Sequence, residues 1–312
     1  MKKLTVITWA IRNGGRLEMK IKLFTHSDLD GIGCACIANI VFGDENVDYE
    51  ICGYQNIDEK ISTYLENKEY EKYNKTYITD ISVKKEIAEK INQCKKTFRL
   101  LDHHKTAEFL NTYEWATVIV QNKDNIKECG TSLLYQELYG KEAYNCNELG
   151  NFVEMVRQYD TWEWKQTKNE SPKRLNDIFG IIGYADFIDY YSNNYYKSIE
   201  EFANMFPDKF MELLKYKRRE IDLVIDEKLK KVKIKGDYAI SLCDRKDLTS
   251  ELGSKILDQF ENINYVMLVY DGGVALRSVG DFDVSEIAKQ YGGGGHKNAA
   301  GFIHNEWYKF LK

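Results

Sequence analysis

The sequence is poor in proline and in histidine, with two prolines and five histidines among 312 residues. So few prolines exclude a stiff, proline-rich linker. No run of 18 apolar residues occurs, which excludes an ordinary membrane-spanning helix. The net charge of −5 also lacks the basic excess of proteins that grip long nucleic acids. A short anionic substrate held through metal ions would not require such an excess.

Cysteine is present but forms no recognisable motif. The seven cysteines are scattered, odd in number and never spaced as Cys-x-x-Cys. The basic start of the chain leads into an apolar stretch that ends at Arg12, and no small-residue cleavage pattern follows, so we find no secretory signal. We therefore expect reduced thiols and a cytoplasmic protein. The strand-like start at Met19 predicts that residues 1–18 are an N-terminal extension.

Residues 20–160 alternate short apolar stretches with amphipathic ones. The expected strands are 20–25, 47–53, 76–80, 97–101 and 116–121. The expected helices are 32–42, 57–72, 83–94 and 131–139. This alternation predicts an α/β fold with a doubly wound, mostly parallel sheet and helices on both faces. Residues 147–235 are predicted to be mostly helical, and after Lys235 the alternation resumes in a second, smaller α/β unit.

Carboxylates and imidazoles follow the ends of several expected strands. After the first strand come His26, Asp28 and Asp30, whose alternation places them on one face if the backbone stays extended. The other candidates follow later strands or a helix: Asp80, Asp102, His103, His104 and Asp160. Because the carboxyl ends of parallel strands meet at one edge of a sheet, we expect these side chains to converge there.

A cluster of carboxylates of this kind needs cations. Unpaired carboxylates repel one another and are costly to desolvate, and divalent ions offset that cost. A set rich in oxygen ligands with a minority of imidazoles favours Mn²⁺, with Mg²⁺ as the alternative, over zinc. Two such ions about 3.5–4 Å apart activate a water and stabilise the charge that develops on phosphate. The chemistry that the residues indicate is phosphoester hydrolysis.

Short motifs in a characteristic order strengthen this interpretation. In the first part of the chain they are HSDLDG (26–31), ITD (78–80), LDHH (101–104) and YDTW (159–162). Together they resemble the motifs of the DHH phosphoesterases. Near the C-terminus, VALRS (274–278) and DVSEIAKQYGGGGHKNAAGF (283–302) resemble the partner DHHA1 domain. The resemblance covers nearly the whole chain from about residue 20.

The resemblance assigns metal-binding roles to matching positions. A first ion would be held by His26, Asp28 and Asp80. A second ion would be held by Asp30, Asp80, His103 and Asp160, so that Asp80 bridges the two ions. The first motif here is spaced His-x-Asp-x-Asp, whereas many members have His-x-x-x-Asp-x-Asp. This departure leaves open whether His26 is a ligand or the neighbour of one.

Catalytic and substrate-binding roles follow from the same resemblance. Asp80, Asp102 and His104 form the catalytic group, in which Asp102 would orient His103 and His104 would face the scissile phosphate as a hydrogen-bond donor or proton carrier. In the second domain, the residues that would grip a terminal phosphate or nucleotide are Arg277, Gly293, Gly294, Gly295 and His296. Consecutive glycine N–H groups are able to form such an anion nest.

Less specific interpretations exist for single residues. Asp80 and Asp160 could each be a helix cap or turn residue, and the glycines at 292–295 could simply end a helix. An isolated pair of histidines at a strand end would also mean little. The order of the other motifs favours the functional interpretation.

The resemblance also predicts the domain plan and the substrate. The expected divisions are an extension at 1–18, a DHH catalytic domain at 19–185, a helical linker at 186–235 and a DHHA1 substrate-binding domain at 236–312. The resemblance is strongest to oligoribonuclease (nanoRNase) members, which implies a metal-dependent phosphodiesterase that hydrolyses short RNA or DNA oligonucleotides or dinucleotides to mononucleotides.

Several alternatives remain open at this point. They are a phosphodiesterase of cyclic dinucleotides or their linear products (c-di-AMP, pApA), a RecJ-like single-strand DNA exonuclease and, ranked lower, a non-catalytic nucleotide-binding protein. No membrane partner is expected, and a homodimer is one of the oligomeric states left open.

Overall fold

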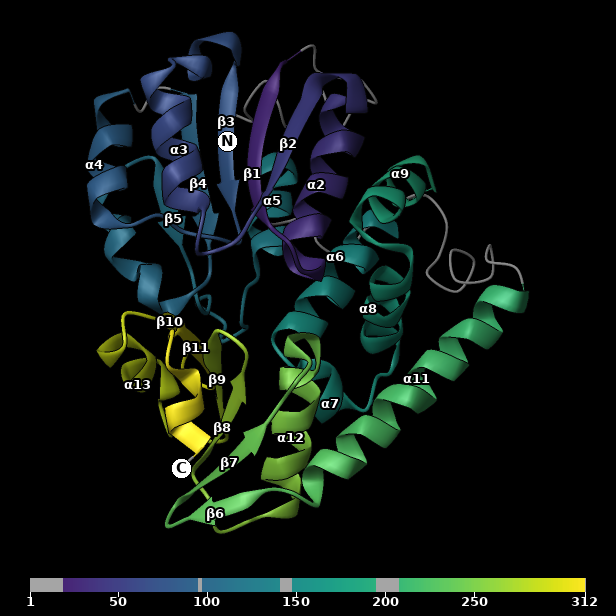
Figure 1. Cartoon of the computed structure of the whole chain (residues 1–312). Coiled ribbons are helices and arrows are strands. Elements are labelled where there is room, and N and C mark those ends of the chain that lie inside the picture. The colour runs from purple at the N-terminus through teal and green to yellow at the C-terminus, as the bar shows by residue number, and fades with distance from the viewer. Residues whose placement is uncertain (1–18, 95–96, 141–147, 195–207, 312) are drawn as a thin grey trace. The chain divides into compact units, whose positions relative to one another are not determined.

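The computed structural model describes residues 19–94, 97–140, 148–194 and 208–311, so the expected extension at 1–18 lies outside the described residues. The chain divides after Asp208 into two compact units, which are described separately below (Figure 1). Among the helices that the structure describes, none is both long and apolar enough to cross a membrane.

The first unit contains a five-stranded sheet whose strands are all parallel. The strands are β1 (Ile21–His26), β2 (Val47–Cys52), β3 (Lys75–Thr79), β4 (Phe98–Asp102) and β5 (Ala116–Val118). They pair in the order β2-β1-β3-β4-β5. The α/β class with a doubly wound parallel sheet is thereby confirmed, and all strand ends that carry site residues lie at one edge.

Helices cover both faces of this sheet (Figure 1). One face packs against α3 (Ile57–Glu66) and α4 (Lys85–Gln93), whose apolar side chains share a core with Phe24 and Leu100 of the strands. The other face packs against α2 (Leu29–Phe42) and α5 (Gly130–Tyr139). Four further helices complete the unit: α6 (Glu148–Asp160), α7 (Glu163–Thr167), α8 (Ser171–Ile182) and α9 (Tyr184–Asn194).

Two elements of the first unit are shorter than the sequence predicts. The helix expected over 57–72 ends at Glu66, and a 3-10 turn follows at Glu69–Lys72. Lys68 between them has a φ of 53°, in the left-handed region, which a continuous right-handed helix cannot contain. The fifth strand ends at Val118 rather than at residue 121, although Gln121 still forms an isolated bridge with Lys127.

The second unit contains a mixed six-stranded sheet. Its strands are β6 (Lys233–Lys235), β7 (Tyr238–Leu242), β8 (Tyr265–Tyr270), β9 (Gly273–Ser278), β10 (Gly294–His296) and β11 (Ala299–Ile303). They pair in the order β10-β11-β9-β8-β7-β6, with only β7 and β8 parallel. The helices of this unit are α11 (Asp208–Leu229), α12 (Thr249–Gln259) and α13 (Val284–Gln290).

Three strands of the second unit have no counterpart in the sequence prediction. They are β6, β10 and β11, which are short or rich in glycine and alanine and therefore show little apolar alternation. The helix α11, by contrast, lies within residues 147–235, which are predicted to be mostly helical. Its C-terminal half packs Ile225 into the core that α12, β7 and β8 also form, so this part of α11 belongs to the second unit.

Candidate metal centre

The backbone after the first strand turns into a helix earlier than the sequence predicts. His26 is the last residue of β1, and α2 begins only three residues later, at Leu29. Asp28 is the N-cap of this helix, and its Oδ1 accepts a hydrogen bond from the backbone N–H of Gly31 at 3.1 Å. The expectation of three extended residues on one face is therefore wrong, because Asp30 already lies in the first helical turn, fully buried.

Gly31 allows this tight transition from strand to helix. A Cβ atom on Gly31 would lie 2.2 Å from the carbonyl oxygen of His26, a distance that no side chain tolerates. The first turn of α2 therefore packs directly against the end of β1. His26 and Asp28 meet as a result, with 2.8 Å between His26 Nδ1 and Asp28 Oδ2.

The N-terminus of α5 holds Asp30 in place. The backbone N–H of Gly130 donates to Asp30 Oδ2 at 2.6 Å, and the N–H of Thr131 donates to Oδ1 at 2.8 Å. The Thr131 hydroxyl also donates to the Asp30 carbonyl oxygen at 2.6 Å. Free N–H groups at a helix N-terminus stabilise a carboxylate in this way. The sequence analysis missed this segment, although Cys129-Gly130-Thr131-Ser132 at an expected helix start is typical of an anion-binding turn.

Asp80 lies at the centre of the site and has an unusual backbone. It follows β3 directly, has a φ of 56° and is 2% exposed. The next helix, α4, begins five residues later at Lys85, so Asp80 is not a helix cap. A Cβ on Gly130 would lie 2.6 Å from the Asp80 Cβ, so only glycine lets α5 approach this closely. A strained, buried carboxylate of this kind is typical of a functional position.

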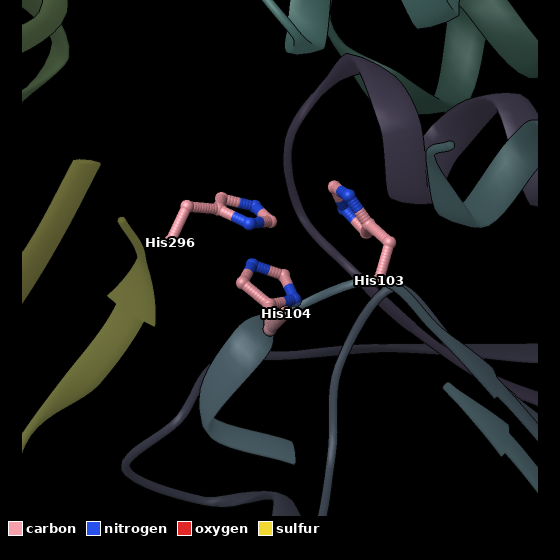
Figure 2. Close-up of side chains that lie close together, drawn as sticks. All are labelled: His103, His104 and His296. Carbon is pink, nitrogen blue, oxygen red and sulfur yellow. The ribbon is translucent and has the colours of Figure 1, made fainter. Parts of the chain in front are cut away.

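The two adjacent histidines turn in different directions at the end of β4, as Figure 2 shows. The ring of His103 is buried, and its Nε2 lies 3.1 Å from Asp80 Oδ1 and 3.5 Å from Asp30 Oδ2. The ring of His104 lies 4.7 Å away, centroid to centroid, and is tilted by 52°.

Asp102 contacts both of these histidines, the ring of the second and the backbone of the first. Its Oδ1 accepts a hydrogen bond from His104 Nδ1 at 2.7 Å, and another from the backbone N–H of His103 at 2.8 Å. Asp102 thus contacts His103, which it is predicted to orient, through the backbone N–H, and it also bonds the ring of His104. The ring of His103 approaches the carboxylates of Asp80 and Asp30.

Asp160 joins the site from the last residue of α6. Its Oδ2 lies 3.6 Å from Nδ1 of His103. The end of α6 is anchored by Arg157, whose guanidinium is buried and donates to Glu154, Glu163 and the carbonyl oxygen of Lys127. This network connects the helix end to two neighbouring segments, which keeps Asp160 at the edge of the sheet.

The six candidate ligands thus come together from four places in the chain. His26, Asp28 and Asp80 each offer one ligand atom within 4.8 Å of the others, and so do Asp30, His103 and Asp160. Asp80 connects the groups, because its Oδ1 approaches His103 and its Oδ2 lies 3.7 Å from His26 Nδ1. The resemblance to the DHH phosphoesterases predicts one ion at His26, Asp28 and Asp80 and a second at Asp30, Asp80, His103 and Asp160.

The candidate substrate-binding residues lie together in the second unit. Arg277 on β9 donates through Nη2 to the Ser250 hydroxyl and through Nη1 to the Leu276 carbonyl oxygen, each at 2.8 Å. Its Nε is buried and has no hydrogen-bond partner among the described residues. Burial lowers the pKa of Arg277 to about 10, which leaves the guanidinium charged at neutral pH.

The glycine run next to Arg277 is not the loop that an anion nest requires. Gly294, Gly295 and His296 form β10 and pair with β11, whose Ala299 pairs in turn with Arg277. The N–H of Gly293 donates to the Ala288 carbonyl oxygen at 2.9 Å, so it closes the end of α13. The glycines allow close strand packing: a Cβ on Gly293 would lie 2.1 Å from the Gly301 oxygen.

Comparison with known proteins identifies the family. Residues 238–310 match the model of the DHHA1 domain. Over 301 residues the chain is 33% identical to Oligoribonuclease NrnB of Bacillus subtilis (strain 168), and the alignment covers 93% of this chain and 74% of that protein. The chain belongs to the DHH/DHHA1 phosphoesterase family.

Solved structures show the same fold. Exonuclease RecJ bound to manganese superposes with a TM-score of 0.54 at 16% identity, over 98% of this chain and 90% of RecJ. The pGpG-specific phosphodiesterase PggH from Vibrio cholerae superposes with a TM-score of 0.53 at 16% identity, over 94% of this chain and 96% of PggH. This member of the DHH family is accordingly a hydrolase of the nuclease and phosphodiesterase class.

The electrostatics of the DHH site fit divalent cations. Burial, followed by the nearby charges of Asp30 and Asp28, raises the pKa of Asp80 well above its usual value, and the pKa of Asp160 is raised for the same reasons. Asp80 Oδ2 is buried without a hydrogen-bond partner among the described residues. A buried oxygen that lacks a donor, among mutually repelling carboxylates, is what a cation would satisfy. The oxygen-rich donor set suits Mn²⁺ or Mg²⁺.

Proposed function

We propose that this protein is a metal-dependent phosphodiesterase that hydrolyses short oligonucleotides to mononucleotides. The observation that carries the proposal is the pair of ligand groups joined by Asp80 at the edge of the parallel sheet. The choice of substrate is supported by the 33% identity to a relative named as an oligoribonuclease. A net charge of −5 also favours a short substrate over a long nucleic acid, which would need a basic surface.

The residues of the first unit would divide the work between them. His26, Asp28 and Asp80 are proposed to hold one ion, and Asp30, His103 and Asp160 a second, with Asp80 between them. Once bound, the ions would lower the pKa of a water and neutralise charge on the phosphate. Manganese is the metal we propose.

Asp102 and His104 would act at the scissile phosphate rather than bind an ion. Burial alone raises the pKa of Asp102, but the nearby imidazole of His104, which is hydrogen-bonded to it, lowers the pKa below its usual value. The carboxylate is therefore ionised and accepts a hydrogen bond from His104 Nδ1, which fixes the orientation of the ring. His104 would therefore act on the scissile phosphate through Nε2, which lies 2.9 Å from the Tyr54 hydroxyl in the substrate-free protein.

The second unit would bind the part of the substrate that does not react. Arg277 offers a charged guanidinium with its Nε unpaired among the described residues, which suits a terminal phosphate. His296 lies on β10 close to Arg277 in the strand register, since both pair with Ala299. We propose that Gly293, Gly294 and Gly295 contribute mainly by bringing these strands together, which leaves Arg277 and His296 as the groups that contact substrate.

A substrate panel tests this proposal. Labelled two-to-five-nucleotide RNA and DNA, c-di-AMP, pApA and longer single strands are incubated with the protein and Mn²⁺, with Asp80→Asn as the matched inactive variant. We expect the fastest hydrolysis for the short RNA oligonucleotides. Faster cleavage of long DNA would replace the proposal with a RecJ-like exonuclease, and faster cleavage of c-di-AMP or pApA with a dinucleotide phosphodiesterase. Absence of hydrolysis of every substrate would refute it.

A further inference from the structure

Tyr54 reaches the site from a strand that carries none of the family motifs. It follows β2, the edge strand of the sheet, in the four-residue connection to α3. The connection is a tight turn, in which Gly53 N–H donates to Asn56 Oδ1 at 2.9 Å and Asn56 N–H donates to the Gly53 oxygen at 3.0 Å. This turn presents the side chain of Tyr54 at the same sheet edge as the candidate ligands.

The phenol contacts two histidines of the site. The ring of Tyr54 lies 5.4 Å from the ring of His26 and 5.8 Å from that of His104, against which it packs edge-on at 88°. The Tyr54 hydroxyl lies 2.9 Å from His104 Nε2, a hydrogen-bond distance. Both ring nitrogens of His104 are therefore engaged, Nδ1 by Asp102 and Nε2 by Tyr54.

The chemistry of the partners determines the direction of these bonds. The Asp102 carboxylate can only accept, so Nδ1 of His104 carries a proton. Tyrosine titrates near 10. Although Tyr54 as a whole is about half exposed, desolvation of its hydroxyl, together with the charges of Asp102 and Asp80, raises the pKa of Tyr54 further. The phenol therefore keeps its proton at neutral pH, and its O–H is able to donate a hydrogen bond to Nε2 when Nδ1 alone carries the ring proton. Two bonds at opposite nitrogens fix both the tautomer and the rotation of the ring.

We infer that Tyr54 is a positioning residue for the hydrolysis, which completes an Asp102–His104–Tyr54 hydrogen-bond chain that holds the His104 imidazole in one tautomer and one orientation at the scissile phosphate. This inference rests on the proposed function, because His104 matters only if a phosphodiester is cleaved beside it. About half of the Tyr54 side chain is exposed, so a contribution to core packing does not account for its position.

Four variants separate the hydroxyl from the ring and from His104. Tyr54→Phe removes only the hydroxyl, and Tyr54→Ala also removes the ring. His104→Ala, alone and combined with Tyr54→Phe, completes a double-mutant cycle. Tyr190→Phe on α9 is the matched control, since Tyr190 is 46% exposed and Tyr54 is 49% exposed. The assay uses the substrate that the panel selects, with Mn²⁺ and the full chain.

We expect Tyr54→Phe to lower kcat about 10-fold, as removal of a partner that orients an active-site imidazole does, while KM stays within about twofold of the wild type. In the His104→Ala background the same change should have no further effect, because the chain is already broken. Wild-type kcat in Tyr54→Phe, or an undiminished effect in the His104→Ala background, overturns the inference. A rise in KM confined to Tyr54→Ala would show instead that the ring stacks on a base.

A second measurement does not depend on activity. Only five histidines are present, so the side-chain ¹⁵N resonances of His104 can be assigned in metal-free protein. We expect a single tautomer with the proton on Nδ1, and a shift of the Nε2 resonance in Tyr54→Phe but not in Tyr190→Phe. If the wild type hydrolyses nothing, the proposed function fails although this hydrogen bond is still observed. If the Nε2 resonance does not move, the role of Tyr54 fails although hydrolysis persists.

Discussion

The two units bury side chains of opposite charge at their candidate sites. In the first unit, five aspartates gather at one edge of the sheet, two of them have raised pKa values, and Asp80 Oδ2 lacks a donor among the described residues. In the second unit, Arg277 stands on the central part of an antiparallel region with its charge retained and its Nε unpaired among the described residues. An excess of buried negative charge requires cations, whereas a buried guanidinium requires an anion.

Glycines permit close packing in both units, but the groups that they position differ. In the first unit, Gly31 and Gly130 let helix starts approach His26 and Asp80, so they shape the positions of ligands. In the second unit, Gly293 and Gly295 let strands and a helix end approach one another, so they shape the sheet behind Arg277. The comparison predicts that damage to the first set affects the metal, and damage to the second affects the substrate.

The largest expected effects are on activity, and they differ between a substitution in the first unit and one in the second. Asp80→Asn removes the carboxylate that both ligand groups share. We expect kcat to fall by more than about 100-fold, which exceeds the cost of losing a residue that only hydrogen-bonds a metal ligand. We also expect tight Mn²⁺ binding to be lost. Arg277→Ala should lower kcat/KM about 10- to 100-fold through KM, the cost of a lost charge-assisted hydrogen bond.

Steady-state kinetics and Mn²⁺ titration calorimetry measure both variants. Circular dichroism of each variant serves as the folding control. Equal loss of Mn²⁺ affinity in the two variants would contradict this division of labour.

The two glycine sets are compared by a pair of matched substitutions. A Cβ on Gly130 would lie 2.6 Å from the Asp80 Cβ, and one on Gly293 would lie 2.1 Å from the Gly301 oxygen. We expect each alanine variant to lose about 1–3 kcal/mol of unfolding free energy through overpacking. Only Gly130→Ala should weaken Mn²⁺ binding, by about 10-fold, because it displaces Asp80. Calorimetry with Mn²⁺ distinguishes them, and normal Mn²⁺ affinity in Gly130→Ala would refute the proposed role of this glycine.

A smaller effect concerns the response of stability to pH. Burial and neighbouring carboxylates raise the pKa of Asp80 and Asp160 in the folded chain, so their contribution to the stability of the metal-free protein is fully present below the unfolded pKa of about 4 and is lost as pH rises through the folded values. Bound cations replace the protons. We therefore expect Mn²⁺ to raise the thermal midpoint by more at pH 7.5 than at pH 5.

Differential scanning calorimetry with Mn²⁺ and with EDTA at the two pH values tests this expectation. Asp80→Asn is the control, since the variant lacks the shared carboxylate and its midpoint should respond weakly to Mn²⁺. An equal rise in the midpoint at both pH values in the wild type would contradict the electrostatic explanation.

Much of the fold could be predicted from the hydrophobic periodicity of the sequence. The first four strands lie within a few residues of the predicted ranges, because buried parallel strands are continuous apolar runs between amphipathic helices. The strands β10 and β11 could not be predicted, because glycine and alanine carry almost no hydrophobic pattern. Their pairing with one another and with β9 is set by contacts between residues far apart in the chain.

The sequence by itself determined which side chains can do chemistry here. The order of HSDLDG, ITD, LDHH and YDTW identifies the carboxylates and imidazoles, because residue type and order along the chain are properties of the sequence. The tertiary structure alone decided their contacts. Asp102 bonds the ring of His104 and the backbone of His103, Asp30 is held by a helix start about a hundred residues away, and Tyr54 reaches His104 from the turn after the edge strand. Such contacts depend on strand order and on side-chain direction at a turning strand end, neither of which a local sequence pattern contains.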